Sequence, residues 1–338
     1  MVPRVRKTIP AGAKSDPIQE GRIRMDEILA VTGITGKSGQ AFAGEIIKHG
    51  DVIRQMFPGG IRLLLHNERE RDKDILPGFE VERMYGDLED EQFLSEALLG
   101  VDTIVHIAGI HWSRQLATAA AANFVRRLIA VHTTGIYSRY KEAGEEYRNI
   151  DDFVYMMCRS KNIILTILRP TMIYGSLNDR NVASFIRMVD KFPVMPVVNN
   201  AMYELQPVHY KDLGRAYYDV LVNEKITGGH DYILSGGEEI MLRDMLCEMG
   251  AYLSKRMRFF NVPFPIAYAG AWILYGLSIG KVDLREKVQR LCEPRVYPHE
   301  EASRDFGYAP RTFRSAIGDE VQQYIEVVKK GMKDRDKR

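Results

Sequence analysis

The amino-acid sequence predicts an α/β fold, a doubly wound parallel sheet with a smaller, mostly helical C-terminal domain. Short apolar runs alternate with helical patterns from residue 27 to residue 168, which is typical of a parallel sheet covered by helices on both faces. Glycines at 33, 36 and 39 lie between the first apolar run and the first helical pattern. The chain has 338 residues, 45% hydrophobic and 27% charged, which suits about two globular domains.

The alternation gives each element of the first half its place. Apolar runs predict strands at residues 27–32, 60–65, 79–85, 103–107, 128–132 and 163–168. Patterns between them predict helices at 40–48, 89–99, 117–124 and 142–158. After Arg169 the prolines cluster, and we expect a helix at 213–222, a late strand at 232–234 and mostly helical structure over 240–328.

One apolar stretch stands apart from these elements. Residues 263–280 read PFPIAYAGAWILYGLSIG, and only about 14 residues follow the early prolines, whereas a membrane span needs roughly 20. We therefore expect a buried or groove-lining helix and no stable membrane insertion. An interfacial membrane helix is the alternative, which the lack of a basic polar face disfavours.

Charge and cysteine content limit the classes of partner and compartment. The net charge is +2, yet residues 1–24 and 329–338 each hold six basic and two acidic residues. We expect 1–25 and 329–338 to be solvated, flexible basic tails; contact with an anionic membrane or nucleic acid is the alternative, and we predict no nucleic-acid partner. The three cysteines form no metal-binding pattern, so no metal is expected. Unpaired cysteines and the absence of an apolar signal-peptide core predict a cytoplasmic protein.

The three glycines predict a loop that binds a dinucleotide. Between a strand and a helix, a first glycine allows a tight turn, a second lets the backbone approach a pyrophosphate, and a third allows close packing of the helix. The start of the helix adds free N–H groups and the positive end of its dipole. The residues placed against the phosphates of NAD or NADP in this Rossmann-type sheet are Gly33, Thr35, Gly36, Lys37, Ser38 and Gly39.

The end of the second strand leaves the choice between NAD and NADP open. An acidic residue there would hold a ribose 2′-hydroxyl and favour NAD. The strand instead ends at Leu65 and is followed by His66, with Arg69 and Arg71 further along. Such a group suits a 2′-phosphate, but it is equally consistent with a solvated surface.

Several motifs, taken in order, resemble the extended or atypical short-chain dehydrogenase/reductase superfamily, in particular its NAD-dependent epimerases and dehydratases. They are TGITGKSG at 32–39, YGDL at 85–88, VDTIVHIAGI at 101–110, LRPTMIYG at 168–175, QPVHYKD at 206–212 and RDFGYAPRTF at 304–313. The resemblance implies a dinucleotide-binding domain over 26–170 that recovers part of 208–235, and a substrate-side domain over 171–328. It also implies cofactor contacts from Asp87, Leu88, Ala108, Gly109 and Pro170.

The family's catalytic set is a Ser or Thr after the fifth strand, followed by Tyr-x-x-x-Lys on the next helix. There the tyrosine acts as acid or base, and the lysine lowers its pKa. Thr133 and Thr134 supply the hydroxyls, and Tyr137 with Lys141 forms a literal Tyr-x-x-x-Lys.

This pair follows the threonines much sooner than in the family. Counting back from the sixth strand instead places Gly144 and Arg148 at the two positions, and the dyad is then missing. An extra turn at the start of the helix would restore Tyr137 and Lys141 on one helix face. The two registers remain open at the level of sequence.

The resemblance also implies contacts to a small-molecule substrate. We assign them to Ile110, His111, Thr171, Tyr174, Gln206 and Arg290, the last because a guanidinium suits a diphosphate. The expected function is hydride transfer by an NAD(P)-dependent oxidoreductase, epimerase or dehydratase acting on a nucleotide sugar, with a homodimer as the family's expected assembly. The alternative is a non-catalytic NAD(P)-binding regulatory or assembly protein, which the second register and the basic tails favour.

Overall fold

The computed structural model describes residues 27–69, 72, 74–140, 144–179, 181–192, 194–279 and 281–336, with side chains up to residue 328. The expectations for the basic tails, for Arg71 and for the Lys141 side chain lie outside the described residues and side chains. The chain divides into two units. Unit 1 contains residues up to 132 together with 149–169 and 214–232, and unit 2 contains 133–148, 170–213 and the residues from 233 onward.

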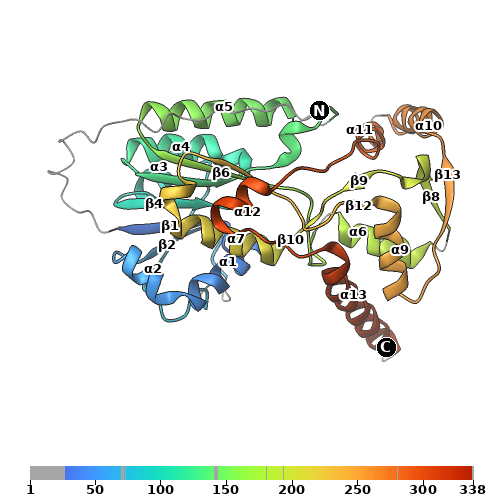
Figure 1. The fold of residues 1–338 in the computed structure, drawn as a ribbon, viewed down its shortest axis with the longest axis horizontal. Helices are drawn as coiled ribbons and strands as arrows, with labels where there is room; N and C mark the ends of the chain where they lie inside the picture. The colour runs from blue at the N-terminus through green and yellow to red at the C-terminus, as the bar shows by residue number, and fades with distance from the viewer. Residues whose placement is uncertain are drawn as a thin grey trace. The chain divides into compact units, whose positions relative to one another are not determined.

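Unit 1 is built around a seven-stranded sheet, which confirms the predicted doubly wound architecture (Figure 1). Its strands are β1 (Ile28–Thr32), β2 (Ile61–Leu65), β3 (Val81–Tyr85), β4 (Val101–His106), β5 (Arg127–Val131), β6 (Ile164–Pro170) and β11 (Asp231–Leu234). They lie in the order β11-β6-β5-β4-β1-β2-β3, and the pairs from β3 to β6 are parallel. The chain runs outward from β1 to β3 and returns to β4 on the other side of β1, which creates the switch point where open α/β sheets bind ligands.

Helices cover this sheet because each has an apolar stripe. In α1 (Lys37–Lys48) the buried residues Gly39, Phe42, Ala43 and Ile46 recur every three or four positions, so one face packs on the strands. The other helices are α2 (Gly50–Met56), α3 (Glu91–Ala97), α4 (Ser113–Ala122), α5 (Gly144–Ser160), α7 (Tyr210–Val222) and α8 (Glu224–Thr227). Figure 1 shows α3, α4 and α5 on one side of the strands and α1, α2 and α7 on the other.

Unit 2 is mostly helical, as predicted, but its described residues also form three two-stranded sheets that the sequence did not indicate. Its helices are α6 (Val182–Lys191), α9 (Leu242–Tyr252), α10 (Phe264–Leu277), α11 (Arg285–Arg290), α12 (Glu300–Phe306) and α13 (Phe313–Asp336). The strand pairs are β10 (Val208–His209) with β7 (Ile173–Tyr174), β12 (Ile240–Met241) with β9 (Glu204–Leu205), and β13 (Arg258–Val262) with β8 (Val194–Val198). The described residues also form the 3₁₀ turns η3 (Ile110–Trp112) in unit 1, and η4 (Thr134–Tyr137) and η5 (Asn199–Ala201) in unit 2.

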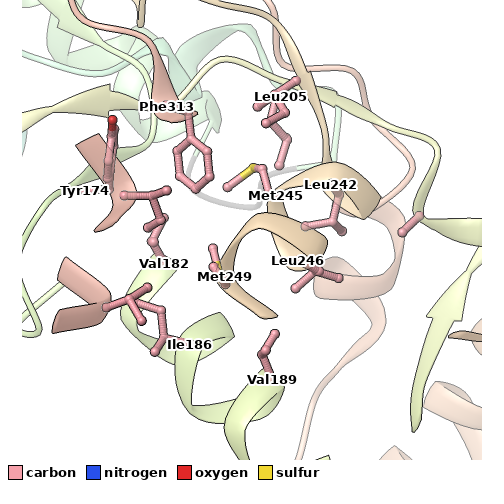
Figure 2. Packing of buried hydrophobic residues seen from close by; sticks show 14 of the residues in the cluster. Tyr174, Val182, Ile186, Val189, Leu205, Leu242, Met245, Leu246, Met249 and Phe313 are labelled. Carbon is pink, nitrogen blue, oxygen red and sulfur yellow. The ribbon is translucent and has the colours of Figure 1, made fainter. Parts of the chain in front are cut away.

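Apolar side chains from three helices form the core of unit 2 (Figure 2). Ile186 and Val189 of α6 join Met245 and Met249 of α9 in this core, and Phe313 adds the start of α13. All five are at most 1% exposed. Burying a side chain of this size stabilises the fold by about 1.5–3 kcal/mol relative to leaving it in water, so this cluster holds the three helices together.

The prediction of a helix at residues 263–280 is confirmed, but the prediction that this helix is buried is wrong. The segment does form α10, but the only buried residue of this helix is Ala271, so the helix lies on the surface. A continuous apolar run has the same pattern in the interior and on a surface, and periodicity could not separate the two. In the described part of the chain, no helix combines the length and the hydropathy that crossing a membrane requires.

Candidate functional site

The loop after β1 in unit 1 has a shape that requires glycine at two positions. Gly33 has a φ of +73°, and a Cβ atom there would lie 2.5 Å from the backbone nitrogen of Ala108. A Cβ atom on Gly39 would lie 2.3 Å from the carbonyl oxygen of Gly33. Both contacts are with backbone atoms, which cannot swing away as a long side chain can. The geometry fits a tight turn at the first glycine and close packing of α1 on the loop at the third.

The start of α1 is open to an anion. Gly36 precedes the helix without a side-chain cap, and both Gly36 and Lys37 are exposed, while Thr35 and Ser38 are half-buried beside them. The first N–H groups of the helix therefore lack an intrahelical partner. A Cβ on Gly36 would approach only the Gly33 carbonyl oxygen, at 3.3 Å. Free N–H groups and the positive end of the dipole favour a phosphate at this position.

Two buried side chains join β1 to the loop after β4. The hydroxyl of Thr32, the last residue of β1, lies 2.7 Å from Nδ1 of His106, the last residue of β4. Nε2 of His106 lies 2.9 Å from the carbonyl oxygen of Gly109, which can only accept, so Nε2 donates and Nδ1 accepts from Thr32. Burial, and then repulsion from His132, lower the pKa of His106 to about 3. The neutral ring thus fixes the turn at Gly109, where φ is +117°.

Three of the predicted cofactor contacts, His66, Asp87 and Leu88, lie together where β2 and β3 end. His66 follows β2, and its Nδ1 lies 3.8 Å from a carboxylate oxygen of Asp87, which follows β3. Leu88 comes next and is half-buried. The carboxylate weakens the attraction of His66 for a 2′-phosphate, so His66 alone does not indicate NADP.

At the end of β5, unit 1 contains a buried polar network that the sequence did not reveal. Nδ1 of His132 lies 2.6 Å from Asp151, and Nε2 lies 3.0 Å from the hydroxyl of Ser113. Asp151 also pairs with Arg169 at 2.7 Å, and Arg169 pairs with Asp231 at 2.9 Å. The network therefore joins α4, α5, β5, β6 and β11.

The order serine, histidine, aspartate is that of many hydrolases, but here it is structural. Ser113 is 1% exposed, so its hydroxyl cannot reach a substrate. Burial keeps the pKa of His132 below its ordinary value although Asp151 opposes this. Burial also opposes ionisation of Asp151, but the bond from His132 and the charge of Arg169 outweigh it and lower the pKa of Asp151. A neutral histidine and a charged aspartate are the states that hold these elements together.

In unit 2, Thr133 and Thr134 differ in how they use their hydroxyls. Thr133 is half-buried, and its Oγ1 accepts a hydrogen bond from the Gly135 N–H at 3.0 Å, which caps η4. Thr134 is buried, and its hydroxyl donates to the carbonyl oxygen of Pro170 at 3.1 Å. Thr133 is therefore the better placed of the two to donate its hydroxyl proton to a ligand, while Thr134 and Pro170 bond to each other.

Tyr137 lies on η4 and not on α5. Its ring packs against Tyr297, with the ring centroids 5.6 Å apart. Of the two registers that the sequence leaves open, the one with Tyr137 on an extra turn of α5 is not seen, since Tyr137 lies on η4. The start of α5 fits the other register, with Gly144 and Arg148 at the two family positions. Nη1 of Arg148 donates to the carbonyl oxygen of Ile136 at 3.1 Å.

Three residues predicted to contact substrate serve the fold of unit 2 instead. Tyr174 is 1% exposed and belongs to the hydrophobic core. Gln206 is buried, and its amide donates to a backbone carbonyl and accepts from the Tyr297 N–H, each at 2.9 Å. The hydroxyl of Thr171 donates to the backbone carbonyl of Gln206. A motif position does not reveal which way a side chain points, so the sequence could not indicate that Tyr174 and Gln206 face the interior of unit 2.

The other predicted substrate residues of unit 1 lie on η3, directly after Gly109. Ile110 is buried, which excludes it as a contact, whereas His111 is exposed. Among the described residues, no group of three His, Cys, Asp or Glu side chains could hold a metal ion.

Two arginines of unit 2 come together near the end of α11. Burial, and then the charge of Arg290, lower the pKa of Arg295. Within the described chain, the buried Nε atoms of both have no hydrogen-bond partner. Arg290 pairs with Glu286 at 3.4 Å, whereas the nearby carboxylate of Glu293 is bonded to the Ser138 hydroxyl at 2.6 Å. Two adjacent cations with unused donors suit an anionic ligand, and the sequence indicated only the first of them.

The arrangement of strands and helices matches solved structures closely. A dTDP-glucose 4,6-dehydratase from Streptomyces venezuelae, solved with NAD bound, aligns over 88% of this chain and 97% of its own length, with a TM-score of 0.66 and 18% identity. The chain therefore has the Rossmann-like α/β fold of these structures. No family model matches the sequence. The fold therefore places the loop at Gly33 where such proteins bind their dinucleotide.

Curated relatives of this fold cover different shares of the chain. The 2-alkyl-3-oxoalkanoate reductase of Stenotrophomonas maltophilia is 21% identical over 84% of this chain and 94% of its own. N-acetyl-α-D-glucosaminyl-diphospho-ditrans,octacis-undecaprenol 4-epimerase of Escherichia coli O157:H7 is 22% identical over 57% of this chain and 67% of its own. Subunit 9 of the mitochondrial NADH dehydrogenase 1 alpha subcomplex of Arabidopsis thaliana is 22% identical over 74% of this chain and 64% of its own length. The resemblance to epimerases, dehydratases and reductases inferred from the motifs is confirmed.

Proposed function

We propose that the protein is an NAD(P)-dependent oxidoreductase, epimerase or dehydratase that acts by hydride transfer. The loop from Gly33 to Gly39 carries this proposal, because its backbone leaves the uncapped first turn of α1 open to a pyrophosphate. When bound, the nicotinamide supplies or accepts the hydride. The neutral His106 supports the binding role by fixing the turn at Gly109. Three free cysteines, Cys158, Cys247 and Cys292, support a cytoplasmic location.

The residues of unit 2 that we assign to substrate chemistry are Thr133 and Tyr137. The Thr133 hydroxyl would orient a substrate oxygen, since its Oγ1 already accepts the Gly135 N–H and keeps its proton for donation. The phenol of Tyr137 would transfer the proton, with Lys141 as the cation that the family places beside it. These roles rest on the motif and on the position of both residues on one 3₁₀ turn and its cap.

We infer a nucleotide sugar as the substrate, with Arg290 and Arg295 as the site for its diphosphate. The guanidinium is planar and offers paired donors, so two arginines with unused Nε atoms match the charge and geometry of a diphosphate. A relative named as an epimerase of a sugar joined through a diphosphate to undecaprenol supports the sugar and diphosphate parts of this inference. His111, exposed after Gly109, is the remaining candidate for a substrate contact.

Calorimetric titration with NAD and NADP in both redox states is the first test. Tight binding of NAD with little binding of NADP supports an epimerase or dehydratase, which regenerates its cofactor within one cycle. A preference for NADPH supports a reductase. Absence of binding by all four forms contradicts the proposal.

Turnover then separates the enzyme from its alternative. We expect Tyr137→Phe to lower kcat about 100-fold or more while dinucleotide affinity stays unchanged, since general acid–base catalysis contributes factors of this size. Tyr140→Phe, on an exposed residue three positions along, is the matched control and should leave kcat unchanged.

A second candidate function is that of a non-catalytic dinucleotide-binding protein. The start of α5 favours it, because Gly144 and Arg148 occupy the positions at which the family has its tyrosine and lysine. A relative that is a subunit of a respiratory complex supports this class. Dinucleotide binding without turnover of any sugar nucleotide or ketone would favour it over the first.

A further inference from the structure

Helix α10 exposes apolar side chains along its whole length. It has 14 residues and no charged side chain. Ile266 is 64% exposed, Ile273 63% and Leu277 79%, and Ile279 just beyond the helix is 88% exposed. Large aliphatic side chains are mostly buried on folding, and a contiguous exposed patch of them marks an interaction site.

The two faces of α10 differ in what covers them. One face carries aromatic rings: Phe264 stacks on Tyr268 at 5.6 Å, and the guanidinium of Arg285 in α11 lies 3.9 Å from the ring centroid of Tyr275. Figure 1 shows α10 and α11 next to each other. The opposite face is exposed, and its residues recur every three or four positions: Ile266, Gly270, Ile273 and Leu277. These residues form a face that no other element of the described chain covers and that a partner could contact, and we call it the aliphatic face of α10.

Basic residues border this helix on both sides. Residues 255–290 contain seven basic and two acidic side chains, a net charge of +5, whereas the whole chain has +2. Arg256 and Arg258 precede α10, Lys281 and Lys287 follow it, and all four are exposed. The rest of the chain, both basic tails included, is net negative, so residues 255–290 are a further segment with an excess of positive charge. A bilayer with anionic lipids offers the complement, hydrocarbon next to negative head groups.

We propose that α10 and these four basic residues dock the protein peripherally on an anionic bilayer. The aliphatic face offers no side-chain donor or acceptor, whereas protein–protein interfaces carry about one hydrogen bond per 100–200 Å². Hydrocarbon requires none. Trp272, 48% exposed, belongs to the aromatic face, with the Arg285 guanidinium 4.3 Å from its ring centroid, and tryptophan favours the boundary between hydrocarbon and head groups. With 14 residues against the roughly 20 that a span requires, the helix lies in the interface and does not cross it.

Vesicle flotation with the full chain tests the proposal. We expect binding to vesicles of phosphatidylcholine mixed with phosphatidylglycerol, weaker binding to phosphatidylcholine alone, and release by salt. The double substitution Ile273→Glu and Leu277→Glu should lower the bound fraction about tenfold or more, since both carboxylates would enter the hydrocarbon boundary. Val327→Glu is the matched control, because Val327 is 61% exposed on α13 of the same unit. It should leave binding unchanged.

Charge variants and the basic tails sharpen the result. Lys281→Glu with Lys287→Glu should weaken binding to the mixed vesicles and leave binding to phosphatidylcholine unaltered. The α10 double variant retains both tails. If it still binds the mixed vesicles as strongly as the natural chain, the tails carry the contact and the proposal is wrong.

Tryptophan emission locates the contact directly. The chain has two tryptophans, so Trp112→Phe leaves Trp272 as the reporter. On vesicle binding we expect a blue shift and quenching by brominated acyl chains. An unchanged spectrum overturns the proposal. A different result would also overturn it: the protein does not bind vesicles, light scattering shows a dimer, and Ile273→Glu with Leu277→Glu makes the protein monomeric. In that case a second copy of the chain covers α10.

Discussion

The first turns of α1 and α5 differ in how much of the family's pattern they keep. At α1 every glycine is present, and two are enforced by backbone contacts of 2.5 Å and 2.3 Å that any side chain would violate. At α5 the helix begins with Gly144, where a Cβ would meet its nearest neighbours at 3.5 Å, an ordinary contact. The start of α1 is therefore constrained by its surroundings. The start of α5, in contrast, has room for a side chain at Gly144.

This difference separates binding from chemistry. The loop at α1 needs only N–H groups and space, which the fold supplies through backbone geometry. Proton transfer needs a particular side chain at a particular place, and in the register that the start of α5 fits, Gly144 and Arg148 stand at the two positions of the family's dyad. The binding proposed for the loop at α1 therefore does not depend on the register of α5, whereas the proposed chemistry does.

The comparison between the two helices fails if α5 as a whole packs weakly on unit 1. Asp151→Asn tests the packing of α5 and has the largest expected effect on stability. The change removes the charge that pairs with Arg169 and the acceptor that orients His132, both in a buried network. We expect a loss of about 3 kcal/mol in the free energy of unfolding, measured with urea. Asp152→Asn, one position along and exposed, should change it by less than about 0.5 kcal/mol. Equal effects would mean that the network does not stabilise α5.

Substitutions within α1 test whether the glycine loop is constrained as the comparison requires. Gly39→Ala should lower dinucleotide affinity about 100-fold, or about 2.7 kcal/mol, because its Cβ would displace the Gly33 carbonyl. Gly44→Ala on the same helix has no atom within 4 Å of the added Cβ. It should leave affinity unchanged and raise stability by about 0.5–1 kcal/mol. Calorimetry on both variants checks this, and an unaltered affinity for Gly39→Ala would contradict the assigned loop.

The pH dependence of folding tests how His106 holds the loop. Its pKa falls from 6.5 to about 3 on folding, so between these values the unfolded chain binds a proton that the native ring does not. This contribution is present above pH 6.5 and is lost as pH falls toward 3, at about 1.4 kcal/mol per pH unit. The natural chain should therefore show a steeper loss on acidification than His106→Asn. Burial raises the pKa of Glu320 to about 9, which acts in the opposite direction in both proteins, so their difference isolates His106. Parallel curves in urea titrations would show that the ring is not buried neutral.

The smallest effect is expected at the start of α5. Arg148→Ala removes one bond to the Ile136 carbonyl at an exposed site, and we expect a loss of about 1 kcal/mol in stability. Dinucleotide affinity should not change. A large loss of affinity or turnover would give Arg148 a chemical role and remove the contrast between the two helices.

The fold and the glycine loop were predictable because their signals are local. Strands such as β2 are buried at every residue and leave a continuous apolar run, and the glycines lie at fixed spacing between a strand and a helix. The site residues that failed depend on contacts across the chain. Tyr174 and Gln206 lie in motifs that the family uses at its site, yet here they point into the interior of unit 2.

The sequence failed to indicate other residues for the same reason, because their roles depend on contacts across the chain. His106 bonds to a threonine 74 positions away, and Arg295 became notable only once Arg290 was found beside it. The surface position of α10 could not be read from its composition, since an apolar helix has no periodic signal that distinguishes an interior from an exposed face.

The contact between Gly33 and Ala108 also sets an order of assembly. The turn that binds the phosphates is shaped against backbone that belongs to the end of β4, far along the chain. A nascent polypeptide still lacking β4 on the ribosome holds all three glycines but not the surface that bends them. The dinucleotide binding proposed for this loop therefore requires that synthesis has passed β4, and a fragment that stops before this strand has the motif without the shaped turn.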